Sequence, residues 1–213
     1  MDDKQALFAC KNELRRSIFQ FNFLPAAYLH PSYRESFFPG MPEKIWEVPR
    51  ILGKLSVLML RKLEYPEPIL KPDHWGWPVA LLPQNRLVRL ASLIGAISLR
   101  DQVRSSLARD HVMSWKRKLG IDAYQFAMTS ASLLPSVCSG DMCSGEISPE
   151  AIGYSVIFAS IQTMPNPMLE RVRLKLPRTI ETLEFDSLKA RRILTSVLDI
   201  SEGKWSSSHA ATY

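Results

Sequence analysis

The sequence predicts a mainly α-helical protein that forms one compact multi-helix domain. A length of 213 residues suits one domain, or one domain with extensions. A composition of 46% hydrophobic and 23% charged residues is that of a globular protein and excludes a wholly disordered chain. We expect the domain to span residues 1–203 and residues 204–213 to form a flexible tail. Apolar residues recur at helical spacing, most regularly at Leu87, Leu90, Ile94 and Ile97.

Two helices and a connector are expected in the N-terminal half. Residues 4–19 place Leu7, Leu14 and Ile18 on one stripe, together with Cys10 or Lys11. Residues 43–63 predict a second helix, in which Pro49 begins a new piece or introduces a kink. Four prolines among residues 65–78 predict an extended connector. The side of the second helix expected to be buried holds Ile45, Trp46, Leu52, Leu55, Leu58, and Met59 or Lys62.

Further helices follow the regular apolar repeat in the middle of the chain. Asp101 is a predicted N-cap for residues 102–108, and Asp110 for residues 111–119. Gly120 predicts the end of the second of these helices, since glycine favours the position after a helix. Residues 122–134 predict another helix, closed by a proline, and a Ser- and Gly-rich loop covers 136–147.

The C-terminal part begins with a strong helix start. Ser148 is the predicted N-cap, Pro149 occupies the first helical position, and Glu150 follows in the first turn. Residues 182–199 predict the last helix. Residues 169–177 leave two alternatives open, because Val172, Leu174 and Leu176 alternate as in a short strand or extended segment. A helix that starts at Asn166-Pro167 would instead place Leu169, Val172 and Leu176 on one face.

The positive charge is concentrated in one segment. Residues 86–118 hold eight basic and two acidic side chains, which equals the whole net charge of +6. Such a block is typical of a surface that meets an acidic protein, nucleic acid or an anionic membrane, or of a solvated helix face. Five arginines of this block lie on successive predicted helices and are candidate partner-binding residues: Arg86, Arg89, Arg100, Arg104 and Arg109.

The N-terminal residues and the cysteines predict the compartment. No apolar run reaches the roughly 18 residues that a membrane span needs. The first residues, Met-Asp-Asp-Lys, are acidic before they are basic and lack the apolar stretch of a secretory signal. An odd number of cysteines, three, favours reduced thiols in a cytoplasm. We therefore expect a soluble intracellular protein.

No catalytic, cofactor-binding or metal-binding residue is predicted. Cys138 and Cys143 could reach one ion, but zinc sites need two more ligands and the four histidines are scattered singly. The pair Asp73-His74 stands alone, and the motifs of nucleophile elbows, phosphate loops and dinucleotide-binding turns are missing from the sequence. We expect a protein that is not an enzyme.

Three tryptophans, two in the connector and one in the basic block, each allow two interpretations. Trp75 and Trp77 either dock the connector on the core or form an anchor for a partner. Trp115 and the cations at 116–118 could stack a base while neutralising phosphate, or the cations could simply favour the C-terminal end of a helix.

Three motifs carry a resemblance to a known family. They are Phe21-x-Phe-x-Pro-Ala-Ala-Tyr-Leu-His30, Leu82-Pro-Gln-Asn-Arg-Leu87 with the apolar helix through Ile97, and Leu174-Lys-Leu-Pro177. In order and spacing they resemble the YscK/SctK proteins of bacterial type III secretion systems, over most of residues 20–178. Chain length and sequence character resemble the nodulation-associated, NolU-like rhizobial branch.

The resemblance implies a non-enzymatic accessory protein of the cytoplasmic sorting platform. Family members connect the cytoplasmic domain of the inner-membrane ring protein, SctD, to the C-ring pod protein, SctQ, and indirectly to SctL and the ATPase. The implied location is the bacterial cytoplasm at the cytoplasmic face of the inner membrane, without nucleic acid and without membrane insertion. The alternative is a basic nucleic-acid-binding or regulatory protein.

Two structural expectations follow for these segments. Phe21, Phe23 and Tyr28 should pack on the core, each burying apolar area worth roughly 1.5–3 kcal/mol. The five arginines should share a face that docks an acidic patch on the ring or pod protein, since guanidinium groups bind carboxylates through paired hydrogen bonds.

Overall fold

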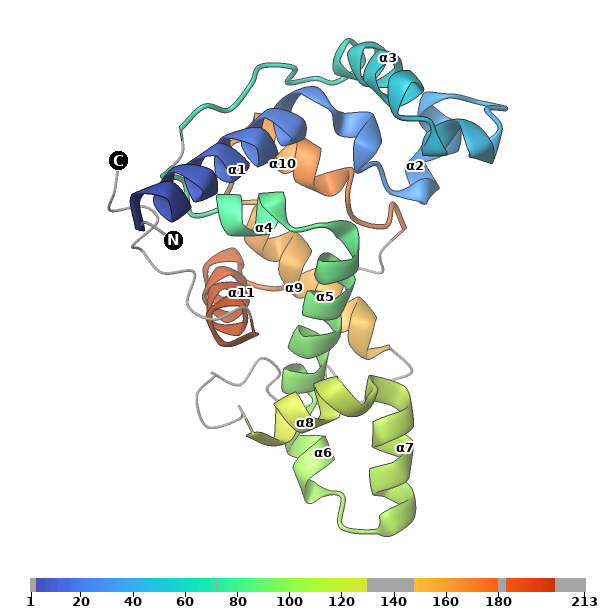
Figure 1. Ribbon diagram of the computed structural model, residues 1–213. Coiled ribbons are helices and arrows are strands. Elements are labelled where there is room, and N and C mark those ends of the chain that lie inside the picture. The colour runs from blue at the N-terminus through green and yellow to red at the C-terminus, as the bar shows by residue number, and fades with distance from the viewer. Residues whose placement is uncertain (1–2, 72, 130–147, 180–182, 202–213) are drawn as a thin grey trace. The chain divides into compact units, whose positions relative to one another are not determined.

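The computed structural model describes residues 3–71, 73–129, 148–179 and 183–201 (Figure 1). These residues form eleven α-helices and two short 3₁₀ helices and contain no β-strand, so the predicted mainly α fold is confirmed. None of the helices in these ranges combines the length and the apolar composition that a membrane span requires.

The chain forms two compact units. Among the described residues, unit 1 comprises residues 3–71, 73–84 and 164–179, and unit 2 comprises residues 85–129, 148–163 and 183–201. The expected single domain over residues 1–203 stays a prediction. The expected tail at 204–213 lies outside the described residues.

Proline starts most helices of unit 1. Five elements carry it in their first two positions, where the missing N–H costs no hydrogen bond. Pro49 thus begins α3 behind a separate 3₁₀ turn, as one of the two alternatives for that residue predicted. The elements are α1 (Asp3–Phe23), η1 (Pro25–Ala27), α2 (Pro31–Phe37), η2 (Glu43–Glu47), α3 (Pro49–Leu60), α4 (Trp77–Leu81) and α10 (Asn166–Arg173).

The core of unit 1 joins its two sequence segments. Leu174, next to α10, packs in one cluster with residues of η1, η2 and α3. Leu58 was expected on the buried side of α3 but is 45% exposed, because its neighbours Leu55 and Met59 face the core instead. The buried members of the cluster are Ala26, Leu29, Trp46, Leu55, Met59, Leu63 and Leu174.

Buried polar side chains hold the connector after α3. Asn22 accepts a hydrogen bond from the Ile69 N–H (2.8 Å) and donates one to the Ile69 carbonyl (3.0 Å). Arg171, whose side chain is fully buried, donates to the carbonyls of Tyr65 and Pro66. The extended connector expected over 65–78 therefore exists, except that α4 already begins at residue 77.

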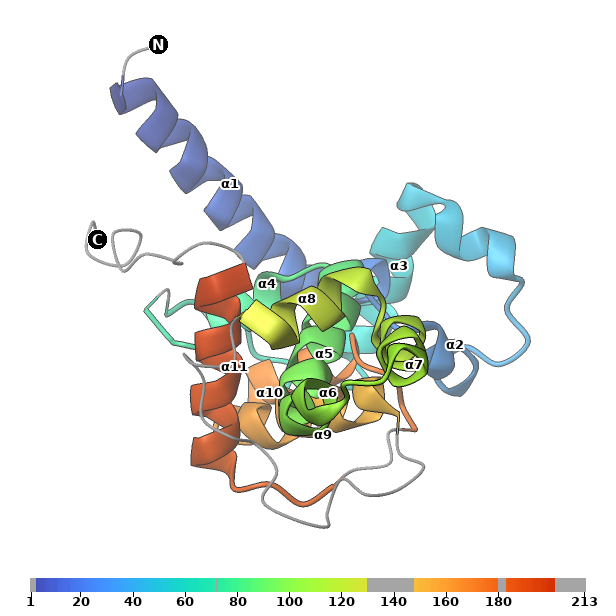
Figure 2. The same ribbon diagram turned by 90° about the horizontal axis from the view of Figure 1, so that it is seen from below.

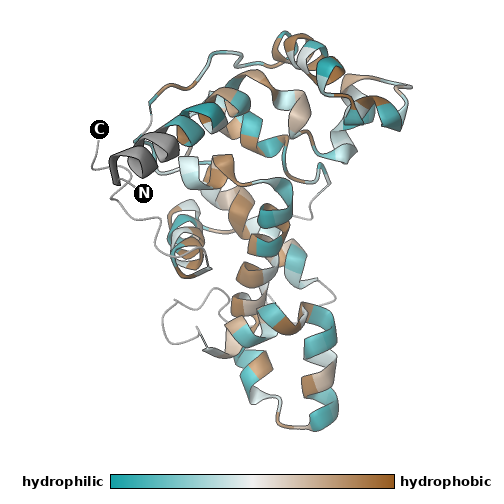
Figure 3. Cartoon of the chain, in the orientation of Figure 1, coloured by the Kyte–Doolittle hydropathy of each residue, from teal (hydrophilic) through white to brown (hydrophobic). Residues whose placement is uncertain are grey.

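Unit 2 contains the regular helix that the apolar repeat predicted. Gln84, at the boundary of the units, begins α5 (Gln84–Ser98), and Leu87, Leu90, Ile94 and Ile97 on it are all buried. Figure 3 shows the C-terminal half of α5 mostly in hydrophobic colours, whereas α7 is mostly hydrophilic. The other helices are α6 (Arg100–Ser105), α7 (Arg109–Leu119), α8 (Ile121–Thr129), α9 (Pro149–Ile161) and α11 (Ser187–Ser201).

The predicted helix ends of unit 2 are partly confirmed. Ser148 caps α9 by accepting the Ala151 N–H at 3.1 Å, and Gly120 ends α7 with a φ of +79°. The predicted caps Asp101 and Asp110 are wrong, because each lies one residue inside its helix, in the first turn. The expected helix over 122–134 is described from residue 121 to 129, and the rest lies outside the described residues.

Close helix contacts build the core of unit 2. A Cβ on Gly95 of α5 would lie 1.8 Å from the Pro149 carbonyl oxygen, and one on Gly153 of α9 would lie 1.8 Å from that of Ala91. Only glycine therefore lets the two backbones approach this closely. In the same unit α11 packs against α9, and α8 contacts both α6 and α7. Figure 2 shows α8 beside these two helices.

The ambiguous segment 169–177 is helical at its start. The helix α10 runs to Arg173, and the following N–H groups of Leu174, Lys175 and Leu176 continue in turn-like hydrogen bonds. The strand alternative is therefore wrong. Val172, Leu174 and Leu176 are all buried because the turn after α10 redirects the side chains.

Candidate protein-interaction site

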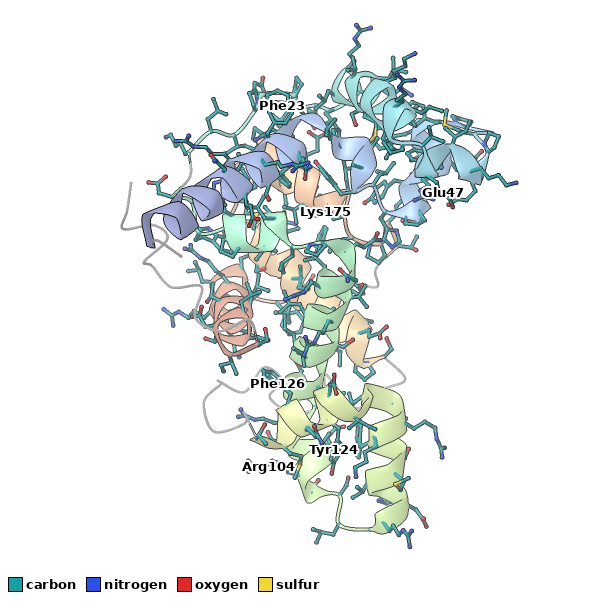
Figure 4. All side chains as sticks on the ribbon, in the orientation of Figure 1. Phe23, Glu47, Arg104, Tyr124, Phe126 and Lys175 are labelled. Atoms are coloured by element: carbon teal, nitrogen blue, oxygen red, sulfur yellow. The ribbon has the colours of Figure 1, made fainter. Side chains whose placement is uncertain are left out.

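The predicted arginines lie on α5, α6 and the start of α7, all in unit 2. Arg86, Arg89, Arg104 and Arg109 are exposed, and Figure 4 labels Arg104 on α6. Arg100 differs, because only 15% of its side chain is exposed and its Nε lies 3.5 Å from the Asp101 carboxylate. Four of the five candidates are therefore exposed to solvent, whereas the Arg100 side chain is largely buried within the unit.

The last turn of α7 extends the positive surface. Lys116, Arg117 and Lys118 are exposed at the helix end where the macrodipole favours cations. The Lys116 ammonium lies 5.4 Å from the centre of the Tyr124 ring, and that of Lys118 lies 5.5 Å from the Trp115 ring. Residues 85–129 hold eight basic and three acidic side chains, so this part of unit 2 presents a positive field.

The Trp115 side chain is a structural element of this region. It is half-buried, its indole N–H donates to the Ser106 hydroxyl at 3.0 Å, and Lys118 lies over its ring. The indole thus ties α7 to the end of α6.

Trp77 docks the connector on the core, as one of its two interpretations proposed. It is 3% exposed, its indole N–H donates to the Lys71 carbonyl, and its ring meets Phe21 edge-on at 5.5 Å. A buried ring offers no anchor to a partner. Trp75 is half-buried beside His74, whose Nδ1 accepts the Gly76 N–H at 3.1 Å.

Metal ligands do not gather in the part of the chain that the structure describes. No group of three or more His, Cys, Asp or Glu side chains could hold an ion there. Cys138 and Cys143 lie outside the described residues.

The three motifs quoted above meet around the Lys175 side chain in unit 1. Its ammonium donates to the carbonyl of Ala80 (2.6 Å), two residues before the central motif, and to that of Leu82 (2.5 Å), the first residue of the motif. It also lies 5.7 Å from the Phe21 ring and 5.3 Å from the Tyr28 ring, which belong to the first motif. Figure 4 shows Lys175 within this unit. One cation thus connects three segments far apart in the sequence.

Burial controls the charge state of this lysine. Lys175 is 4% exposed, and loss of hydration lowers the pKa of its ammonium from 10.5 to about 7. A pocket of about 200 Å³ lies beside it, lined among others by Gln20, Tyr28 and Pro83. The Tyr28 hydroxyl donates to the Phe21 carbonyl at 2.7 Å, and burial raises the pKa of that phenol.

A comparison with protein families identifies the chain. The family model described as YOP proteins translocation protein K (YscK) matches residues 16–198. The chain belongs to the YscK family. YscK proteins are components of type III secretion and are not a known enzyme family, so this is a type III secretion-related protein. No curated protein and no solved structure gave a match.

The sequence did not lead us to Lys175, and the prediction that Phe23 packs on the core is wrong. A charged residue between two leucines in Leu174-Lys-Leu-Pro177 was the available signal for a buried cation. Phe21 is buried in unit 1 and the half-buried Tyr28 packs against its core, as predicted. Phe23 is 38% exposed and pairs with Phe19 at 4.8 Å. The reason is that α1 extends through Phe23, which turns residues two apart to different faces.

Proposed function

We propose that this chain is a non-enzymatic adaptor of the type III secretion sorting platform. It links the cytoplasmic domain of the ring protein SctD to the pod protein SctQ, and through SctQ to SctL and the ATPase. It acts in the bacterial cytoplasm at the inner membrane. The family match over residues 16–198 is the observation that carries the proposal. Its place in the rhizobial, nodulation-associated branch stays a prediction.

The positively charged segment of unit 2, residues 85–129, is the proposed docking surface for one of these partners, and we refer to it as the positive face. Arg86, Arg89, Arg104 and Arg109 are exposed on it and can form paired hydrogen bonds with carboxylates. Because exposed ion pairs are screened over about 8 Å at physiological ionic strength, binding should weaken as salt rises. Lys175 of unit 1 is buried and donates to backbone carbonyls within that unit, so it does not belong to this surface.

A binding experiment with charge-reversal variants tests the proposal. The purified chain is titrated with the SctD cytoplasmic domain and with SctQ from the same bacterium, at two salt concentrations. The double variant Arg104→Glu, Arg109→Glu should bind one of them at least about tenfold more weakly. The double variant Lys189→Glu, Arg192→Glu reverses two exposed cations on α11 outside the positive segment, so it is the control with the same change in charge, and it should change binding less than about twofold.

Each result has a defined meaning. Far-UV circular dichroism must show equal helix content in all three proteins. If wild type binds neither protein, the adaptor role is refuted. If the double variant binds as wild type does, the positive face is not the interface. DNA binding by wild type that the double variant has lost would favour the nucleic-acid-binding alternative.

A further inference from the structure

Unit 2 contains a pocket next to one of the exposed arginines. Its volume is about 340 Å³, and it lies between α5 and the turn that joins α7 to α8. Gly120 forms this turn with a φ of +79°, a backbone conformation that is strained for residues with a Cβ atom. The turn thereby brings the end of α7 and the start of α8 against α5.

One part of the pocket is apolar. Leu93 of α5 and Leu119 of α7 line it and are otherwise buried, with exposed fractions of 4% and 9%. Ile121 lines it too but is 64% exposed, which is unusual for a large aliphatic side chain. An apolar side chain placed here would contact all three and would remove Ile121 from water.

The other part of the pocket is charged. The exposed Arg89 lines it, and Lys116, Arg117 and Lys118 precede the turn by less than two helical turns. Asp122 lines the pocket as well, and Glu150 lies nearby, since its carboxylate is 3.4 Å from the hydroxyl of the lining residue Ser92. The lining itself holds one cation and one carboxylate, but residues 85–129, which include all of the lining residues, hold eight basic and three acidic side chains, so the field of this segment is positive.

We propose that this pocket binds an apolar side chain from an acidic segment of a partner protein. The apolar group packs against Leu93, Leu119 and Ile121, while a neighbouring carboxylate pairs with Arg89. A nucleic-acid phosphate suits the site less, because the apolar side chains of Leu93, Leu119 and Ile121 offer a phosphate no hydrogen bond. Only the identity of the partner protein depends on the adaptor role proposed above.

Peptides test the pocket independently of that adaptor role. The full chain, labelled with ¹⁵N, is titrated with the capped peptide Asp-Glu-Leu-Asp-Glu and with the same peptide carrying Ser for Leu. We expect the amide signals of Gly120 and Ile121 to shift, and the leucine peptide to bind about fivefold more tightly. Ile121→Ser should remove this preference, and Arg89→Glu should abolish binding of both peptides.

Matched controls separate the pocket from general charge attraction. Leu188→Ser removes a 62% exposed leucine on α11, and Arg192→Glu reverses an exposed arginine there, so both variants should bind like wild type. Asp122→Asn should tighten binding about two- to threefold, because it removes the carboxylate that repels an acidic ligand.

Three outcomes would overturn the pocket assignment. They are equal affinity for the two peptides, no shift at residues 120 and 121, or weaker binding by Asp122→Asn. If the peptides behave as expected but SctD and SctQ do not bind, the pocket stands and the adaptor role fails. If SctD or SctQ binds and the peptides show no leucine preference, the adaptor role stands and the pocket assignment fails.

Discussion

Replacing Lys175 by methionine should change how stability depends on pH. In the folded chain the ammonium is buried, and its pKa is lowered to about 7, against 10.5 in the unfolded chain. Between these two values the unfolded chain binds the proton and the folded chain does not. The free energy of unfolding of the wild type therefore rises with pH across this window, and the cost of burying the charge is fully present below pH 7.

The magnitude follows from the two pKa values. Linkage gives a rise of about 3 kcal/mol in the free energy of unfolding between pH 7 and pH 9.5. This is an upper limit, because the carbonyls of Ala80 and Leu82 and the rings of Phe21 and Tyr28 favour the charged form. The methionine variant has no such rise, but it leaves the two carbonyls unpaired at about 1–3 kcal/mol each.

Urea unfolding followed by far-UV circular dichroism at pH 6, 7, 8, 9 and 9.5 measures this effect. At pH 7 the free energy gained in Lys175→Met by not burying a charge nearly cancels the free energy lost by leaving the two carbonyls unpaired. At pH 9.5 the gain is small, so the variant should be about 2–3 kcal/mol less stable than wild type. Lys54→Met, at an exposed lysine on α3 of the same unit, should run parallel to wild type. Parallel curves for Lys175→Met would refute the assignment of a buried, titrating ammonium.

Two further substitutions, each with a matched partner, test the packing. Gly153→Ala should lower the free energy of unfolding by about 1–3 kcal/mol, because the added Cβ would overlap the Ala91 carbonyl. Gly53→Ala should raise it by up to about 1 kcal/mol, because a Cβ at that position has no other atom within 4 Å and alanine favours a helix over glycine. Urea unfolding measures both, and equal effects would contradict the close approach of α5 and α9. Phe21→Ala should cost about 3–5 kcal/mol and Phe23→Ala about 1 kcal/mol or less in thermal unfolding, and a reversed order would place the wrong phenylalanine in the core.

Features that depend on a few neighbouring residues were predictable from the sequence. The cap at Ser148, the end of α7 at Gly120 and the start of α3 at Pro49 are set by local backbone geometry. The buried face of α5 followed from spacing alone, because one turn of helix returns a side chain to the same face.

Prediction from neighbouring residues failed for the helix caps, because an aspartate is favourable at more than one position near the start of a helix. An aspartate stabilises a helix start both as the cap and within the first turn. Leu99, which precedes α6, has a φ of −98° and a ψ of 6°, so the chain passes from α5 into α6 without the extended residue that a cap needs. Asp101 therefore lies within the first turn and does not cap α6.

The sequence by itself determined that this chain is helical, that its positive charge lies in one segment, and which family its motifs resemble. Those properties follow from the spacing of apolar residues, the composition of each segment and the order of the motifs. Only the tertiary structure decided that Lys175 is buried between three distant motifs, that Gly95 and Gly153 face each other's backbones, and that Arg89 borders a pocket. These facts depend on which segments meet in space, because the carbonyls that accept from Lys175 and the backbones that approach Gly95 and Gly153 come from distant parts of the sequence.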